Sequence, residues 1–131
     1  MTDSPHIIVI DDDPLVLEVT AELLEFTGAR VTCAQEWTDL GGSDLSATVD
    51  LILLDVMMPS LRGDDLVPIL RRNLSPRTVI VLYSGMPAPE LAKIAQECGV
   101  EHFLQKGSVT GHALIKAVEA LLPSRPAPQL S

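Results

Sequence analysis

Short apolar segments recur along the chain, and each ends in polar or turn-forming residues. They cover residues 7–10, 30–34, 51–54, 78–82 and 102–105, and the second is the weakest. An apolar run of four or five residues between turn formers is typical of a strand buried in a parallel sheet. The pattern therefore predicts five strands, and the middle one, LILL, ends directly at Asp55.

Helical periodicity separates these strands. Asp13 and Pro14 predict the start of the first helix, because aspartate caps a helix N-terminus well and proline suits its first position. Apolar side chains at steps of three and four residues then predict one buried stripe, made of Val16, Val19, Leu23 and Phe26. Gly28 is expected to end this helix.

Further helices are expected over residues 63–73, 87–98 and 108–122, the last capped by Ser108. Residues 35–48 are the least regular, and only Trp37 and Leu40 suggest a short helix there. Because strands and helices alternate throughout, we predict a doubly wound α/β fold, with a parallel sheet covered by helices on both faces. One domain is expected over 1–122, with Pro-rich 123–131 as a flexible tail or the start of a linker.

Composition narrows the function classes. The chain has 131 residues, of which 47% are hydrophobic, and no apolar run approaches the roughly 20 residues that cross a bilayer. The net charge of −9 argues against direct nucleic-acid binding, since phosphate contacts need clustered Lys and Arg. The first residues do not resemble a signal peptide, and Cys33 and Cys98 have no metal-site spacing. We therefore expect a cytoplasmic protein without membrane contact.

Chemically active side chains follow several predicted strands. Asp11 and Asp12 follow the first, Asp55 the third, Ser84 the fourth and Lys106 the fifth. The carboxyl ends of parallel strands meet at one edge of a sheet, where such folds bind their ligands. Clustered carboxylates favour a hard cation such as Mg²⁺, and an adjacent lysine and hydroxyl suit a phosphoryl group. Asp55 is then the expected nucleophile, forming an acyl phosphate.

The order of these residues resembles the receiver domain of bacterial two-component response regulators, including the single-domain chemotaxis type. The resemblance rests on IDDD at 10–13, on D-x-x-M-P-x-x-x-G from Asp55 to Gly63, on Ser84, and on FLQK at 103–106. It spans residues 7–122. It implies a flavodoxin-like five-stranded parallel sheet with strand order 2-1-3-4-5.

The resemblance also implies a role for each acidic residue. Asp55 is similar to the phospho-acceptor of the family, which becomes 4-aspartylphosphate. Asp12 resembles the direct Mg²⁺ ligand, and Asp11 a ligand acting largely through water. The backbone carbonyl of Met57 would complete the protein's share of the metal shell together with Asp55.

The remaining motif residues resemble the switch of the family. Lys106 would pair with the phosphoryl group, Ser84 would move inward to hydrogen-bond it, and Phe103 would turn inward with Ser84. The family more often has threonine at position 84, and its lysine is usually followed by a proline in a cis peptide bond, where this chain has Gly107. These departures remove no chemical group, so they bear on the rigidity of the switch rather than on phosphorylation.

The implied function is a Mg²⁺-dependent phosphorylation switch and not an enzyme, although it would catalyse its own phosphorylation and dephosphorylation. Its implied partners are a histidine kinase or phosphotransfer protein, and an effector that reads the fourth helix, fifth strand and fifth helix. A homodimer formed on phosphorylation is also consistent with the resemblance. Two alternatives stay open: an interaction module that works without phosphorylation, and an aspartyl-phosphate phosphohydrolase, for which Asp11-x-Asp13 would be the D-x-D motif.

Overall fold

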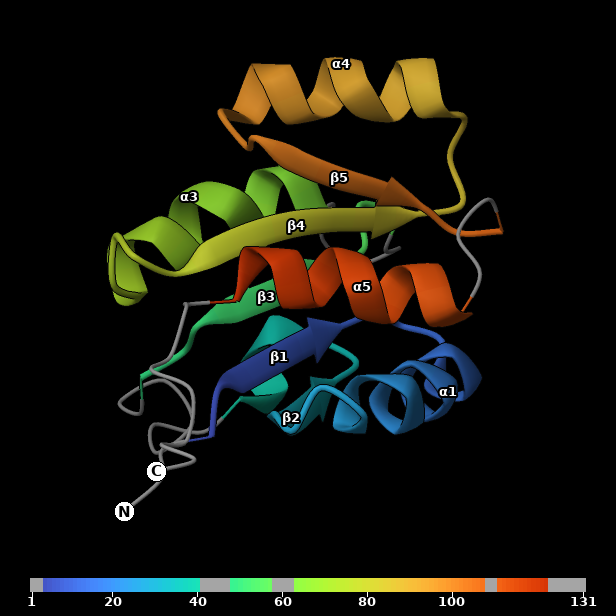
Figure 1. Cartoon of the computed structure of the whole chain (residues 1–131). Coiled ribbons are helices and arrows are strands. Elements are labelled where there is room, and N and C mark those ends of the chain that lie inside the picture. The colour runs from blue at the N-terminus through green and yellow to red at the C-terminus, as the bar shows by residue number, and fades with distance from the viewer. Residues whose placement is uncertain (1–3, 41–47, 58–62, 108–110, 123–131) are drawn as a thin grey trace.

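Five parallel strands form the centre of the molecule (Figure 1). The computed structural model describes residues 4–40, 48–57, 63–107 and 111–122. The strands are β1 (His6–Ile10), β2 (Arg30–Ala34), β3 (Leu51–Leu54), β4 (Val79–Ser84) and β5 (His102–Gln105). Their spatial order is β2-β1-β3-β4-β5, which confirms the flavodoxin-like α/β fold and the 2-1-3-4-5 order.

Helices cover both faces of this sheet (Figure 1). They are α1 (Pro14–Glu25), α3 (Gly63–Asn73), α4 (Ala88–Cys98) and α5 (Gly111–Leu121), with the short 3₁₀ helix η1 (Trp37–Asp39) after β2. The helices α1 and α5 pack on one face, and α3 and α4 pack on the other. Within the described residues, none of the helices has the length and apolar character that spanning a bilayer requires.

Alternate residues of each central strand pack into two separate hydrophobic cores, because successive side chains of a strand point to opposite faces of the sheet. Toward α3 and α4 point Ile8, Ile10, Ile52, Leu54, Ile80 and Leu82. Toward α1 and α5 point Ile7, Val9, Leu51, Leu53 and Val81. This alternation decides on which side of the sheet a residue just beyond a strand end will lie.

The first helix begins as predicted, but the predicted buried stripe is only partly right: Leu23 packs against the core, whereas Val19 and Phe26 are exposed. Asp13 caps α1, its Oδ1 accepting the backbone N–H of Leu15 at 2.9 Å, and Pro14 is the first helical residue. The residues that α1 buries are Leu17, Thr20 and Leu24, whereas Val19 is 49% and Phe26 78% exposed. Apolar residues lie on two sides of this helix, and the sheet packs against the side that contains Thr20.

The other segments follow the prediction closely. Gly99 ends α4 in the left-handed region at φ 72°, which suits glycine because it has no Cβ. The fourth strand continues beyond the predicted residue 82 and includes Ser84 as its last residue. The motif residues Met58 and Pro59, the predicted cap Ser108 and the 123–131 tail lie outside the described residues.

Candidate functional site

Backbone hydrogen bonds carry the strand register into the residues that follow β1 and β3. The N–H of Asp11 donates to the carbonyl of Ala34 at 3.1 Å, and the N–H of Asp55 donates to the carbonyl of Ile10 at 3.0 Å. Both aspartates are therefore held by the sheet at its carboxyl edge. They also continue the alternation of β1 and β3, whose odd-numbered residues face α1 and α5.

Three carboxylates meet at this edge. One oxygen from each of Asp11, Asp12 and Asp55 lies within 4.8 Å of the others. Asp11 is 2% and Asp55 6% exposed, while Asp12 is open to solvent. Three oxygen donors with one open side suit a hard cation such as Mg²⁺, which keeps part of its water shell. These residues therefore fit the predicted metal.

Burial raises the pKa of Asp55 above its usual value, and the nearby Asp11 and Asp12 charges act in the same direction. Two contacts oppose the rise: the backbone N–H of Met57 donates to Asp55 Oδ1 at 3.1 Å, and the ammonium of Lys106 lies nearby. A partly desolvated carboxylate beside a fixed cation is a common feature of functional sites. Asp55 is thus a weakly solvated carboxylate beside a cation, which favours reaction as a nucleophile.

Lys106 brings a positive charge to the same place from β5. Its Nζ contacts Oδ2 of Asp11 directly and lies 3.7 Å from Oδ2 of Asp55. The backbone at Lys106 is held to β4 by its N–H, which donates to the carbonyl of Ser84 at 2.7 Å. The predicted convergence of lysine and carboxylates is therefore present, with the ammonium nearer to Asp11 than to Asp55.

The two predicted switch residues lie on β4 and β5. Ser84 is fully buried, and its Oγ accepts the backbone N–H of Met86 at 3.3 Å. Phe103 is 37% exposed, so its ring is partly in solvent. Met57, predicted to offer its backbone carbonyl to the metal, has a largely exposed side chain.

One residue of the site was missed by the sequence analysis. The ring of Tyr83, next to Ser84 on β4, lies below Lys106, with 5.5 Å between the ring centroid and Nζ. The signal was available in the strand alternation, because Tyr83 shares the odd-numbered side of β4 with Val81, which faces α1 and α5. Burial raises the pKa of Tyr83, so the phenol keeps its proton at neutral pH.

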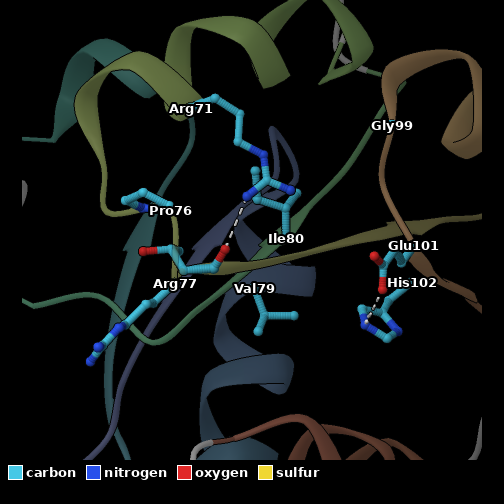
Figure 2. A pocket seen from close by; sticks show the side chains of 9 residues that line it. Arg71, Pro76, Arg77, Val79, Ile80, Gly99, Glu101 and His102 are labelled. Atoms are coloured by element: carbon cyan, nitrogen blue, oxygen red, sulfur yellow. Dashed lines mark hydrogen bonds and ion pairs between the residues drawn. The ribbon is translucent and has the colours of Figure 1, made fainter.

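A hollow of about 170 Å³ lies at the opposite edge of the sheet from the acidic site, where β4 and β5 begin (Figure 2). Two of its charged or titratable groups have partners within the chain. Arg71 Nη1 donates to the carbonyl of Thr78 at 3.1 Å, and His102 Nε2 lies 4.0 Å from a carboxylate oxygen of Glu101. Figure 2 shows Arg77 extending away from the other residues. This hollow contains none of the residues of the acidic site.

Comparison with known proteins agrees with this geometry. Residues 7–119 match the family described as the response regulator receiver domain. The chain is 29% identical over 119 residues to the transcriptional regulatory protein CpxR of Escherichia coli, covering 88% of this chain and 48% of CpxR. It is 28% identical over 117 residues to a gliding motility regulatory protein of Myxococcus xanthus, covering 88% of this chain and 15% of that protein. The chain thus spans about half or less of these curated relatives.

Solved structures show the same fold. Chemotaxis protein CheY4 of Vibrio cholerae superposes with a TM-score of 0.80 at 21% identity, covering 92% of this chain and all of that one. The receiver domain of Francisella response regulator 1452 superposes with a TM-score of 0.73 at 27% identity, covering 90% and 96% of the two chains. The match to the family spans most of the chain, including both strands that carry the aspartates and the strand that carries the lysine. The chain belongs to the response regulator receiver domain family.

Proposed function

We propose that the chain is a Mg²⁺-dependent phosphorylation switch of a two-component system and that Asp55 accepts the phosphoryl group. The observation that carries the proposal is the group of buried Asp55, buried Asp11 and Lys106 at the carboxyl edge of the sheet. The like charges of the three carboxylates call for a cation, and Lys106 lies 3.7 Å from the proposed nucleophile. A solved receiver domain, DrrB, is described as activated by BeF₃, and its fold matches this chain with a TM-score of 0.77.

Each side chain has a defined part in the proposed transfer. A carboxylate oxygen of Asp55 forms a bond to phosphorus as the bond from phosphorus to the donor nitrogen breaks, and the donor histidine keeps that electron pair. Bound Mg²⁺ would add positive charge next to the phosphoryl oxygens, with Asp11, Asp12, Asp55 and the Met57 carbonyl as its protein ligands. Lys106 neutralises a second side of the group, and Ser84 donates a hydrogen bond to it.

The surface of α1 supports a protein as the donor. Leu15, Val19 and Phe26 are exposed and are spaced by four and seven residues, so they lie on one side of the helix; we call them the α1 outer stripe. The helix begins next to Asp12 and Asp13, beside the acidic site. A phosphohistidine that reaches Asp55 brings its own domain against this neighbourhood. We therefore assign the stripe to the phosphohistidine-bearing domain of the donor.

The output face is proposed to lie on the other edge of the sheet, over α4, β5 and α5. Phe103 is partly exposed on β5, and the backbone of Lys106 is bonded to Ser84. A change at Ser84 therefore has a short path to this face. Either an effector or a second phosphorylated copy of the chain would bind there.

The remaining expectations form part of the same proposal. The chain is a signalling module that turns over only its own phosphoryl group, and it works in the cytoplasm. Residues 1–122 form the receiver domain, and 123–131 a tail or the start of a linker. The relatives are longer than this chain, so the proposal covers only the receiver function. Any output activity belongs to the protein or domain that the receiver controls.

Incubation with acetyl phosphate and Mg²⁺, followed by intact-protein mass spectrometry, tests the proposal. Wild type is expected to gain the mass of one phosphoryl group, whereas Asp55→Asn gains none because the amide is not a nucleophile. Asp39→Asn, which makes the same change of side chain on η1, is the matched control and should be phosphorylated like wild type. Labelling of Asp55→Asn equal to that of wild type would overturn the assignment.

A further inference from the structure

We propose that Tyr83 is a positioning residue, whose aromatic face holds the ammonium of Lys106 beside the phospho-acceptor. The inference rests on the proposed function and adds to it a residue that the motif of the site does not contain. The centroid of the Tyr83 ring lies 5.5 Å from Nζ of Lys106, within the range in which a cation is attracted to a ring face.

The sheet brings the two residues together. Tyr83 pairs with Leu104 in the register of β4 and β5, and Lys106 stands two residues beyond Leu104, so the alternation puts it on the same side. Val81, Tyr83 and Leu104 all belong to the core that faces α1 and α5. Nζ of Lys106 therefore lies over the ring of Tyr83 while it contacts Asp11.

Lys106 benefits from such support because its long side chain is costly to hold in one place. A lysine has a flexible four-carbon stem, and fixing it costs considerable rotamer entropy. The next residue, Gly107, has φ 85°, and a Cβ built on it would contact no atom within 4 Å. Gly107 thus contributes no side chain that could pack beside the lysine. Among the residues that the structure describes, the ammonium contacts Asp11 and the Tyr83 ring, with Asp55 somewhat farther away.

The phenol hydroxyl is not required for this role. The ordinary pKa of a tyrosine phenol is 10.0 and burial raises it further, so Tyr83 meets Lys106 as a neutral ring at pH 7. A cation is attracted by the ring face, which phenylalanine also offers. The prediction is therefore that Tyr83→Phe preserves the positioning and that Tyr83→Leu, which retains an apolar side chain, removes it.

A double-mutant cycle separates positioning from simple packing, because Tyr83 is also a half-buried core residue. The variants are Tyr83→Phe, Tyr83→Leu, Lys106→Met, and Lys106→Met combined with Tyr83→Leu. The measurement is the initial rate of phosphorylation by acetyl phosphate at saturating Mg²⁺. Tyr83→Leu is expected to slow the wild-type reaction about two- to thirtyfold, the range that a cation–ring contact can supply, and Tyr83→Phe to leave it unchanged. In the Lys106→Met background, Tyr83→Leu should have no further effect.

Proton NMR of the Lys106 ε-methylene group tests the contact itself without any phosphodonor. In wild type and Tyr83→Phe, the ring should shift these protons upfield of their position in Tyr83→Leu. If the three proteins give the same shift, the ring does not hold the side chain and the inference is wrong. It is equally wrong if Tyr83→Leu slows the Lys106→Met protein as much as it slows wild type, since the ring would then act through packing alone.

The two readouts also separate this inference from the function on which it rests. If wild type does not accept phosphate at all, the proposed function fails, and the NMR shift still decides whether Tyr83 restrains Lys106. If phosphorylation occurs at Asp55 but the cycle shows no coupling, only the role of Tyr83 is overturned. Thermal unfolding of each variant shows whether the rates are compared between folded proteins.

Discussion

Lys106 pairs with Asp11 although the two residues are 95 positions apart in the chain. They follow β5 and β1, between which the sheet places β3 and β4. The ion pair therefore spans the carboxyl ends of β3 and β4. Oδ2 of Asp55 is 3.7 Å from the same ammonium. A phosphoryl group on Asp55 would compete with Asp11 for Lys106, so a small movement of the ammonium could register phosphorylation.

Magnesium is expected to stabilise the folded protein, because only the folded chain assembles the three carboxylates. The melting temperature should rise with the logarithm of the Mg²⁺ concentration above the dissociation constant. Asp12→Ala should abolish most of this rise. Asp13→Ala is the control, because Asp13 caps α1 but is not in the group of three: it should cost about 0.5–2 kcal/mol of stability and leave the Mg²⁺ response intact. An unchanged response in Asp12→Ala would contradict the metal assignment.

The raised pKa of Asp55 predicts how stability depends on pH in Mg²⁺-free buffer. The folded protein holds the Asp55 proton at pH values where the unfolded chain has released it. This contribution to stability is present below the ordinary value of 3.8 and is lost as the pH rises through the raised folded value. Asp55→Asn, which resembles the protonated form, should therefore unfold at higher urea than wild type at pH 7.

The urea experiment has two controls and one outcome that would contradict the prediction. The stability gap between Asp55→Asn and wild type should close as the pH is lowered below about 4, where the carboxyl of the unfolded chain is also protonated. Glu18→Gln removes one negative charge from the exposed side of α1 and should show no such gap. Equal stability of Asp55→Asn and wild type at pH 7 would show that ionised Asp55 carries no folding penalty.

Ser84 is expected to couple phosphorylation to the output face. Its hydroxyl is buried, and a charge-assisted hydrogen bond to the phosphoryl group would contribute about 1.5–3 kcal/mol. Such a gain shifts a two-state equilibrium by roughly 10- to 150-fold. Ser84→Ala should still accept phosphate at Asp55 but show smaller amide shift changes at Phe103 and along α4. Ser84→Thr retains the hydroxyl and should restore them. A full response in Ser84→Ala would rule out coupling through the hydroxyl.

The α1 outer stripe predicts a defect that depends on the phosphodonor. Val19→Glu places a charge in the middle of the stripe, which is expected to slow phosphotransfer from a histidine kinase about tenfold or more. Phosphorylation by acetyl phosphate should be unchanged, because that donor needs no protein interface. A panel of purified, autophosphorylated kinases supplies the assay. Gln96→Glu, on the exposed side of α4, is the control. A matching loss with both donors would indicate damage to the site rather than to docking.

The burial of α1 predicts opposite outcomes for two apolar residues only two positions apart. Leu24 is fully buried, so Leu24→Ala should lower the free energy of unfolding by about 2–5 kcal/mol. Phe26 is 78% exposed, and Phe26→Ala should change it by no more than about 0.5 kcal/mol. Urea unfolding measures both. A larger loss for Phe26→Ala would mean that this ring is covered in solution.

The strands could be predicted from sequence because each is a short apolar run with turn formers on both sides. The residues of the candidate site could then be predicted from the strands, because the carboxyl ends of parallel strands meet at one edge of the sheet whatever the details of the helices. The stripe of α1 could not be predicted in this way. Apolar residues lie on two sides of the helix, and the buried side includes the polar Thr20, so periodicity assigned the exposed Val19 and Phe26 to the core together with Leu23.

The role of Tyr83 needed the structure for a different reason. Strand alternation puts Tyr83 on the side of the sheet that faces α1 and α5, but the conformation of the Lys106 stem decides whether the ring and the ammonium meet. The pairing of Lys106 with Asp11 was likewise not predicted. The sequence motif identifies the residues of the site but not which of them contact one another in the unphosphorylated protein.

The hydrogen bonds that extend the sheet into Asp11 and Asp55 also determine how the site can fail. The Asp11 amide is bonded to Ala34 of the edge strand β2, whereas the Asp55 amide is bonded to Ile10 between the inner strands β1 and β3. The Asp55 amide should therefore exchange with deuterium only when the whole domain opens. The Lys106 amide is bonded to Ser84 at the end of the edge strand β5 and is followed by Gly107, so the amides of these two residues should exchange through local fluctuations. Asp55, which receives the phosphoryl group, should therefore keep its position for as long as the domain stays folded. Lys106, which senses the group, can change position many times before the domain unfolds once.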